Sequence, residues 1–163
     1  MGEELLYAAE LINRVIEGIT GPRIGLHICR GNWSTREEVL LSGDYAPLLP
    51  ALTRMNVDQF VLEYATPRAG DIEVVGRALN HKELGLGVVN PRTTEVESVE
   101  TIVAQTEKAL EFYPADRIFL NTDCGFGCFA NRCVNVEEIA AAKIANIAAA
   151  AAVLRKKYGQ PSC

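Results

Sequence analysis

Hydrophobic positions along this chain alternate between short apolar runs and longer segments in which apolar residues recur every three to four positions. Short, nearly continuous apolar runs bounded by polar or turn residues are typical of buried strands. The longer segments follow the 3.6-residue period of amphipathic helices. The predicted strands cover residues 23–29, 58–64, 84–89 and 117–121, and the predicted helices cover residues 3–18, 45–55, 72–79, 94–112 and 136–158.

Polar signals at the element ends refine this prediction. Glu95 and Glu97 would lie in the first turn of the 94–112 helix, where carboxylates suit the positive end of the helix dipole. Asn135 is expected to cap the last helix, and Gly159 follows its end. Residues 30–44 are polar and contain Gly, Asn and Ser, so we expect a long loop there.

Each predicted strand is followed by a helical segment, and this alternation predicts an α/β fold with a parallel sheet. The strands read as apolar on both faces, which is typical of sheets buried under helices. A small doubly wound sheet and half of a TIM (β/α)8 barrel both fit four β/α units. A full barrel typically needs about 250 residues, and the chain has 163. We therefore favour half of a barrel, as a single domain over residues 1–163.

Composition and charge narrow the function classes. Hydrophobic residues make up 48% of the chain, the net charge is -5, and no basic cluster is present. These features argue against a general nucleic-acid binder or a binder of anionic membranes. The longest apolar stretch, residues 144–154, is too short to span a bilayer. The start of the chain does not resemble a secretory signal, so a cytoplasmic location is expected.

Reactive or polar side chains lie at or just after the end of every predicted strand. In parallel β/α folds the carboxyl ends of the strands meet at one rim, where active sites form. Strand residues two apart point to the same face, so a His-x-Cys pair on the first strand has both side chains on one side. The residues in question are His27 and Cys29 on the first strand, Glu63 on the second, Asn90 after the third, and Asp123 and Cys124 after the fourth.

These residue types predict a metal site. Zinc accepts His nitrogen, Cys sulfur and Glu oxygen in a tetrahedral shell, and two thiolates favour a soft or borderline metal over Mg²⁺ or Ca²⁺. Thiols in a reducing compartment are also more often metal ligands or reactive groups than disulfides. We expect Zn²⁺ bound by His27, Cys29 and Cys124, with Glu63 as the fourth ligand.

Two loop residues are candidates for substrate binding at the same rim. Arg68 follows Glu63 and could bind an anionic group of the substrate, or it could form a salt bridge within its loop. Trp33 lies in the loop after the His-x-Cys strand and could form a pocket wall or cap the core.

The glycine-rich segment 123–128 leaves two alternatives open. Glycines before a helix can cradle a phosphate, although the Lys-Ser/Thr of a P-loop is missing. Cys124, Cys128 and Cys133 could form a small metal knuckle, although their spacing is not a CxxC pair. We favour a structural or incidental role for Cys128 and Cys133, and a free surface thiol for Cys163.

Several segments together resemble the cobalamin-independent methionine synthase family, and more narrowly its shorter members with one catalytic barrel. The matching residues lie at the four strand ends and in the adjoining loops. The segments are His27-Ile28-Cys29-Arg30-Gly31-Asn32, Leu62-Glu63-Tyr64, Arg68-Ala69-Gly70, Gly87-Val88-Val89-Asn90 and Asn121-Thr122-Asp123-Cys124-Gly125-Phe126-Gly127.

The resemblance implies the C-terminal half of a TIM barrel with zinc on His27, Cys29, Glu63 and Cys124. In that family zinc lowers the pKa of the homocysteine thiol, and the thiolate takes a methyl group from a 5-methyltetrahydrofolate-type donor. Asp123 and Asn90 are then the candidate catalytic residues. Asn90 stands where the long synthases have a histidine, and an amide is not a proton donor of the same kind.

The same residues leave two rival functional hypotheses open, and the half-barrel predicts a partner subunit. The segments Cys29-Arg30-Gly31-Asn32 and Thr66-Pro67-Arg68-Ala69-Gly70 also look like relatives that add a thiol such as coenzyme M to an epoxide. Alternatively, the chain is a fragment that is inactive alone. A half-barrel leaves open strand edges and an exposed apolar interior, so we expect a homo-oligomer or a separate N-terminal half.

Overall fold

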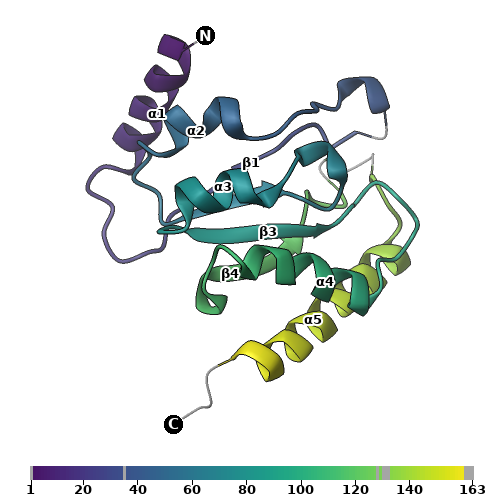
Figure 1. Cartoon of the computed structure of the whole chain (residues 1–163). Helices are drawn as coiled ribbons and strands as arrows, with labels where there is room; N and C mark the ends of the chain where they lie inside the picture. The colour runs from purple at the N-terminus through teal and green to yellow at the C-terminus, as the bar shows by residue number, and fades with distance from the viewer. Residues whose placement is uncertain (1, 35, 128, 130–132, 160–163) are drawn as a thin grey trace.

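Four parallel strands form the central sheet, in the order β1-β2-β3-β4 (Figure 1). This computed structural model describes residues 2–34, 36–127, 129 and 133–159. The strands are β1 (Gly25–Ile28), β2 (Gln59–Glu63), β3 (Glu83–Val89) and β4 (Ile118–Thr122). The helices are α1 (Gly2–Ile16), α2 (Leu49–Leu52), α3 (Ile72–Leu79), α4 (Val99–Leu110) and α5 (Glu137–Tyr158), and short 3-10 turns cover Glu37–Val39, Ala46–Leu48, Pro67–Ala69 and Ala115–Arg117. The predicted α/β fold is confirmed.

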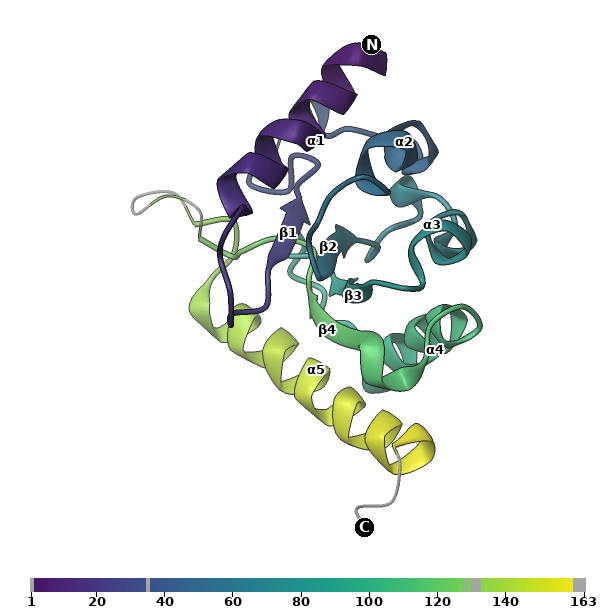
Figure 2. The same ribbon diagram turned by 90° about the vertical axis from the view of Figure 1, so that its left-hand side faces the viewer.

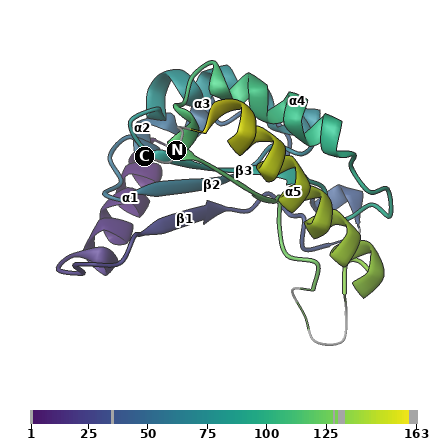
Figure 3. The same cartoon turned by 90° about the horizontal axis from the view of Figure 1, so that it is seen from below.

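The two faces of the sheet differ in character. Helices α3, α4 and α5 lie on one side of it (Figures 2 and 3). The apolar residues of the two central strands on that side, including Phe60, Leu62 and Leu86, are fully buried, whereas those of the edge strands β1 and β4 are partly buried. The register places His27, Val61 and Gly85 in one row on the opposite face. The expectation of apolar residues on both faces is therefore wrong.

The opposite face corresponds to the interior of the half-barrel, and it is not the apolar surface that we expected. A Cβ at Gly85 would meet the side chains of Val61 and Asn121, which places all three on this face. Phe119 pairs with Gly85 and is 38% exposed. Glycines and polar side chains thus share this face with a few apolar ones.

The predicted start of the 94–112 helix and the predicted cap of the last helix are wrong. Helix α4 begins at Val99 rather than residue 94, because the side chain of Ser98 caps it by accepting from the Thr101 N–H. Helix α5 begins at Glu137 without a side-chain cap. Its expected cap, Asn135, donates instead to the carbonyls of Pro91 and Thr93. A local cap therefore sets the start of α4, whereas contacts of Asn135 to the loop of residues 90–98 override its local capping signal.

Other expectations match more closely. The end of α5 at Tyr158, followed by Gly159, is confirmed, and the Gly159 N–H donates to the Arg155 carbonyl. Residues 45–55 form a 3-10 turn and the single turn of α2 rather than one helix, with a proline in the first turn of each. In the described part of the chain, no helix has the length and apolar character needed to cross a membrane.

Candidate metal centre

The four predicted ligands lie together at the carboxyl ends of the strands. His27 and Cys29 come from the end of β1, Glu63 is the last residue of β2, and Cys124 follows β4. One ligand atom from each of the four lies within 4.8 Å of all the others. The two sulfur atoms are 3.9 Å apart. A tetrahedral ion with Zn–S bonds of about 2.3 Å would hold two sulfurs about 3.8 Å apart, so the spacing fits one zinc ion.

The imidazole of His27 is oriented by the neighbouring strand. Its Nδ1 lies 3.1 Å from the carbonyl oxygen of Val61, the residue paired with it across β1 and β2. When Nδ1 carries the proton and donates to this carbonyl, Nε2 is left with a lone pair for a metal. Metal-binding histidines in proteins are commonly oriented in this way.

Glu63 is the buried member of the group. It is only 2% exposed, and its Oε2 accepts a hydrogen bond of 2.8 Å from the Asn32 side chain. Its other carboxylate oxygen, Oε1, is buried and has no hydrogen-bond partner among the described residues. A buried carboxylate oxygen left unpaired is costly. A cation bound between the four side chains would satisfy it, so the residues present fit a zinc ion.

A second layer of polar residues surrounds Glu63. Asn32 is 1% exposed, and its side-chain oxygen accepts from Arg68 at 3.2 Å. The buried carboxylate of Asp123 accepts from the backbone N–H groups of Tyr64 and Ala65, at 3.0 and 2.9 Å. Asp123 therefore ties the end of β4 to the turn that immediately follows Glu63.

Burial dominates the electrostatics of Asp123. Removal from water raises the pKa of its carboxyl group to about 7, and the nearby Glu63 charge acts in the same direction. The backbone N–H groups of Ala65 and Tyr64 and the Arg68 charge partly oppose this rise. The carboxylate thus lies in a site that favours an added positive charge.

Glycine at position 87 makes room for this arrangement. A Cβ on Gly87 would lie 2.2 Å from Oδ1 of Asp123 and 2.8 Å from the Leu62 carbonyl oxygen. No side chain fits at that distance, so the glycine of β3 is required for the close approach of Asp123.

Sequence reasoning missed the contribution of Tyr45. This residue is 1% exposed, and its hydroxyl accepts a 3.0 Å hydrogen bond from the Glu63 N–H. Burial raises the pKa of Tyr45 to about 12, so the hydroxyl stays protonated. The Arg30 guanidinium lies over the ring at 5.0 Å. No local pattern marks Tyr45, whereas Asn32 belonged to a recognised segment without being given a role.

The other predicted site residues lie at the same end of the sheet. Asn90 follows β3, and its side-chain oxygen accepts from the Arg92 N–H. Arg68 contacts the Asn32 amide. Trp33 is 38% exposed and meets the Phe129 ring edge-on at 6.1 Å. The functional roles of Asn90, Arg68 and Trp33 stay predictions, as does the catalytic role of Asp123.

Of the remaining cysteines, the structure describes only Cys133. Cys133 is exposed and is not one of the four grouped residues. Cys128 and Cys163 lie outside the described residues, so the knuckle and the terminal thiol are untested. The phosphate cradle at residues 123–128 is untested for the same reason.

The fold and the site together define a class of protein: a parallel β/α half-barrel with a His-Cys-Glu-Cys group at its strand ends that could hold a metal ion. A family model described as "Cobalamin-independent synthase, Catalytic domain" matches residues 18–152. The chain belongs to that family.

Individual relatives agree with this assignment. The methionine synthase of Pyrococcus horikoshii is 32% identical over 155 residues, which is 95% of this chain and 40% of the relative. The methionine synthase of Saccharolobus solfataricus is 27% identical over 123 residues, 76% of this chain and 33% of the relative. The chain thus spans about two fifths or less of the length of these relatives.

Solved structures show the same relation. A B12-independent methionine synthase from Shewanella sp. W3-18-1, in complex with selenomethionine, superposes with a TM-score of 0.81 at 22% identity, over 96% of this chain and 46% of that one. A putative vitamin-B12-independent methionine synthase from Listeria monocytogenes gives a TM-score of 0.64 at 26% identity, over 90% and 39%. The four β/α units form half of a TIM barrel.

Proposed function

We propose that this chain is the zinc-binding half of a thiol methyltransferase, which moves a methyl group from a 5-methyltetrahydrofolate-type donor to homocysteine and gives methionine. The grouping of His27, Cys29, Glu63 and Cys124 around one point carries the proposal. The unpartnered Glu63 oxygen at this group supports it. Zinc bound there lowers the pKa of a coordinated thiol, so that sulfur can react as a thiolate at neutral pH.

The chain's own residues prepare the site for such a substrate. Asn32 and Asp123 fix the Glu63 carboxylate and the turn behind it. Arg68 places a positive charge beside this layer, where it can bind an anionic group of the amino-acid substrate. The Asn90 amide can donate a hydrogen bond to a substrate, but it cannot give up a proton. The acid that protonates the leaving donor therefore lies elsewhere than at Asn90.

Metal analysis of the purified chain tests the metal centre. We expect one zinc per chain when the protein is prepared reduced and supplied with zinc. Cys124→Ala removes one sulfur ligand and should strongly lower the zinc content. Cys133→Ala is the matched control, because this exposed cysteine is not part of the group. A wild-type chain that binds no zinc would overturn the proposal.

A thiol-alkylation assay tests the reaction. When the chain is combined with the N-terminal half proposed below, homocysteine and a methylated folate should give methionine in the presence of zinc. Coenzyme M with an epoxide is the competing pair, because both reactions share activation of a thiol and differ only in the electrophile. Turnover of the epoxide pair alone would replace the methyltransferase assignment with the epoxide transferase.

The assembly is the last part of the proposal. The chain spans 40% of the Pyrococcus horikoshii relative, and β1 and β4 are the edges of the sheet. An apolar groove between α1 and β1 is lined by residues that include Leu11, Val15 and Leu26, and Val15 is 77% exposed. We propose that a separate N-terminal half, carrying the other four β/α units, covers these edges in the cytoplasm.

Measuring the molecular mass of the chain in solution, with and without the N-terminal half, tests the proposed assembly. The first half of a full-length relative's barrel serves as the added partner. We expect a chain that binds zinc but is inactive alone, and that gains activity when it forms a complex with the added half. An active homodimer without the added half would show that a second copy takes its place.

A further inference from the structure

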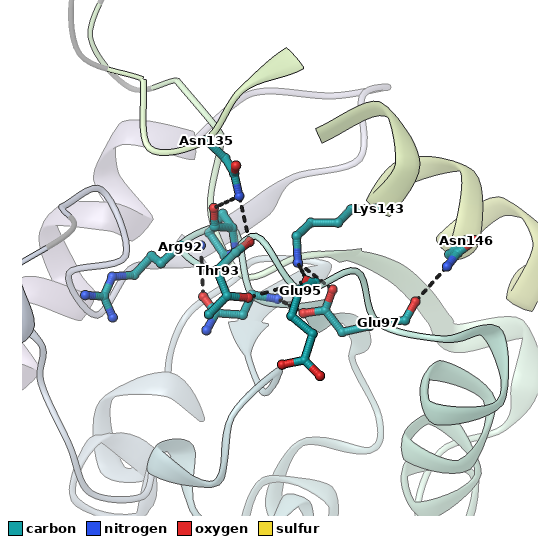
Figure 4. Close-up of polar contacts among 9 residues, drawn as sticks. Arg92, Thr93, Glu95, Glu97, Asn135, Lys143 and Asn146 are labelled. Carbon is teal, nitrogen blue, oxygen red and sulfur yellow. Dashed lines mark hydrogen bonds and ion pairs between the residues drawn. The ribbon is translucent and has the colours of Figure 1, made fainter. Parts of the chain in front are cut away.

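A fully buried lysine on α5 contacts the loop that joins β3 to α4. The Lys143 side chain is 0% exposed, and its Nζ lies 2.7 Å from Oε2 of Glu97. The same ammonium also donates to the Glu95 carbonyl (Figure 4). A buried cation is tolerated only where it is paired and hydrogen-bonded. This pair therefore fixes the loop of residues 90–98 against α5.

Further hydrogen bonds hold the backbone of the 90–98 loop in place. The second Glu97 oxygen accepts from the Asn90 N–H at 2.8 Å. Asn146, also on α5, donates to the Glu97 carbonyl at 2.8 Å. Asn135 donates to two loop carbonyls, those of Pro91 and Thr93. The backbone of the loop is thus bound at several points along its length, as Figure 4 shows.

Arg92 leaves this loop in the other direction. In Figure 4 its side chain extends away from Lys143. Its Nε donates to the Ser34 carbonyl at 2.6 Å, and its Nη2 lies 2.8 Å from the Glu37 carboxylate. The Arg92 side chain is 7% exposed, whereas Glu37 is 81% exposed. The bond to the Ser34 carbonyl is therefore the better shielded of the two contacts.

Ser34 closes the turn that carries Asn32. The Ser34 N–H donates to the Gly31 carbonyl at 3.2 Å, so residues 31–34 form one tight turn. Asn32 lies within this turn, and its side chain donates to Oε2 of Glu63. A continuous series of contacts thus leads from Lys143 through Arg92 to the carboxylate of the metal centre.

We propose that Arg92 is a positioning residue for the metal centre: anchored by the Lys143–Glu97 pair, it fixes the 31–34 turn and so orients the Glu63 carboxylate through Asn32. The metal part of this inference rests on the proposed function. Residues that orient a metal ligand typically change metal affinity by about 10–100-fold when they are removed. Arg92 acts one step further away, so the effect should lie at the lower end of that range.

Zinc affinity, measured by competition with a chelator, is the first test. Arg92→Gln should raise the zinc dissociation constant by about tenfold. Arg36→Gln is the matched control, because Arg36 lies just after the 31–34 turn and its side chain pairs only with the exposed Glu38 in the described structure. Equal dissociation constants for the two variants, to within twofold, would overturn the proposal.

A spectroscopic readout separates positioning from general damage. Cobalt(II) bound in place of zinc gives absorption bands that depend on its ligands and geometry. The Arg92→Gln spectrum should shift towards that of Glu63→Gln, while the Arg36→Gln spectrum stays like the wild type. Weaker binding with an unchanged spectrum would show that Arg92 does not act through Glu63.

The role of α5 is tested with the paired variant Lys143→Met/Glu97→Gln, which leaves no unpaired buried charge. It should fold, as circular dichroism can check, and it should weaken zinc binding. Combined with Arg92→Gln it should add little further loss, because both changes act through one loop. Fully additive losses would contradict a shared path from α5.

Hydrogen exchange tests the positioning of the turn even if the chain binds no metal. Absence of metal binding would refute the proposed function but not this positioning. Amides of the 31–34 turn should then exchange faster in Arg92→Gln than in Arg36→Gln, because the turn loses its anchor. Equal exchange in the two variants would refute the positioning role itself.

Discussion

Gly87→Ala should destabilise the chain by about 3 kcal/mol. The new Cβ would lie 2.2 Å from Oδ1 of Asp123 and 2.8 Å from the Leu62 carbonyl oxygen. Overpacking of this kind typically costs about 1–3 kcal/mol. Asp123 would also be pushed from the backbone N–H groups of Tyr64 and Ala65, and each hydrogen bond to a charged group is worth about 1.5–3 kcal/mol. Partial relaxation of β3 keeps the total below the simple sum.

Urea unfolding followed by circular dichroism measures this loss. Gly25→Ala is the matched control on β1, because its Cβ would meet only the Gln59 side chain at an ordinary 3.5 Å. That variant should be neutral or slightly more stable, by about 0.5 kcal/mol, since alanine restricts the unfolded chain. Zinc content should fall in Gly87→Ala alone. Free energies of unfolding that agree to within about 1 kcal/mol would refute the packing argument.

Two further substitutions test other parts of the structure. Tyr45→Phe removes the acceptor of the buried Glu63 N–H and should cost about 1–3 kcal/mol in urea unfolding. The control Tyr64→Phe removes a buried hydroxyl that has no hydrogen-bond partner in the described structure, so it should be neutral or stabilising. If both variants lose the same stability, the Tyr45 hydroxyl has no special role. Ser98→Ala removes the cap of α4 and should cost about 1 kcal/mol by thermal or urea unfolding. Thr94→Ala, at the helix start expected from sequence, should have no measurable effect. A larger loss of stability in Thr94→Ala than in Ser98→Ala would place the helix start at residue 94.

The fold could be predicted because its signals are periodic and local. The apolar runs of the strands and the 3.6-residue period of the longer helices are local features of the sequence, and α3 was predicted with its observed bounds. The grouping of His27, Glu63 and Cys124 was also predictable, because parallel strands bring their carboxyl ends to one rim. The structure places those side chains together, and zinc binding itself stays a prediction.

What the sequence could not provide depends on contacts between distant segments. Glu97 looked like a first-turn helix residue, yet it accepts from Lys143, which lies 46 residues further along the chain. Asn135 looked like a cap, yet it binds the loop after β3. Tyr45 and Asp123 orient the backbone around Glu63 from other parts of the chain. Local propensity says nothing about such pairings, because the partners meet only in the folded sheet.

The four grouped ligands come from three strands whose contributions lie far apart along the chain. In an unfolded chain these side chains are not held together, so a metal ion bound by all four would favour the folded state over the unfolded one. At a free metal concentration of 100 times the dissociation constant, such binding adds about 2.7 kcal/mol to the stability of the fold. The supply of metal would then set how much of this protein stays folded, and chelation would lower its melting temperature.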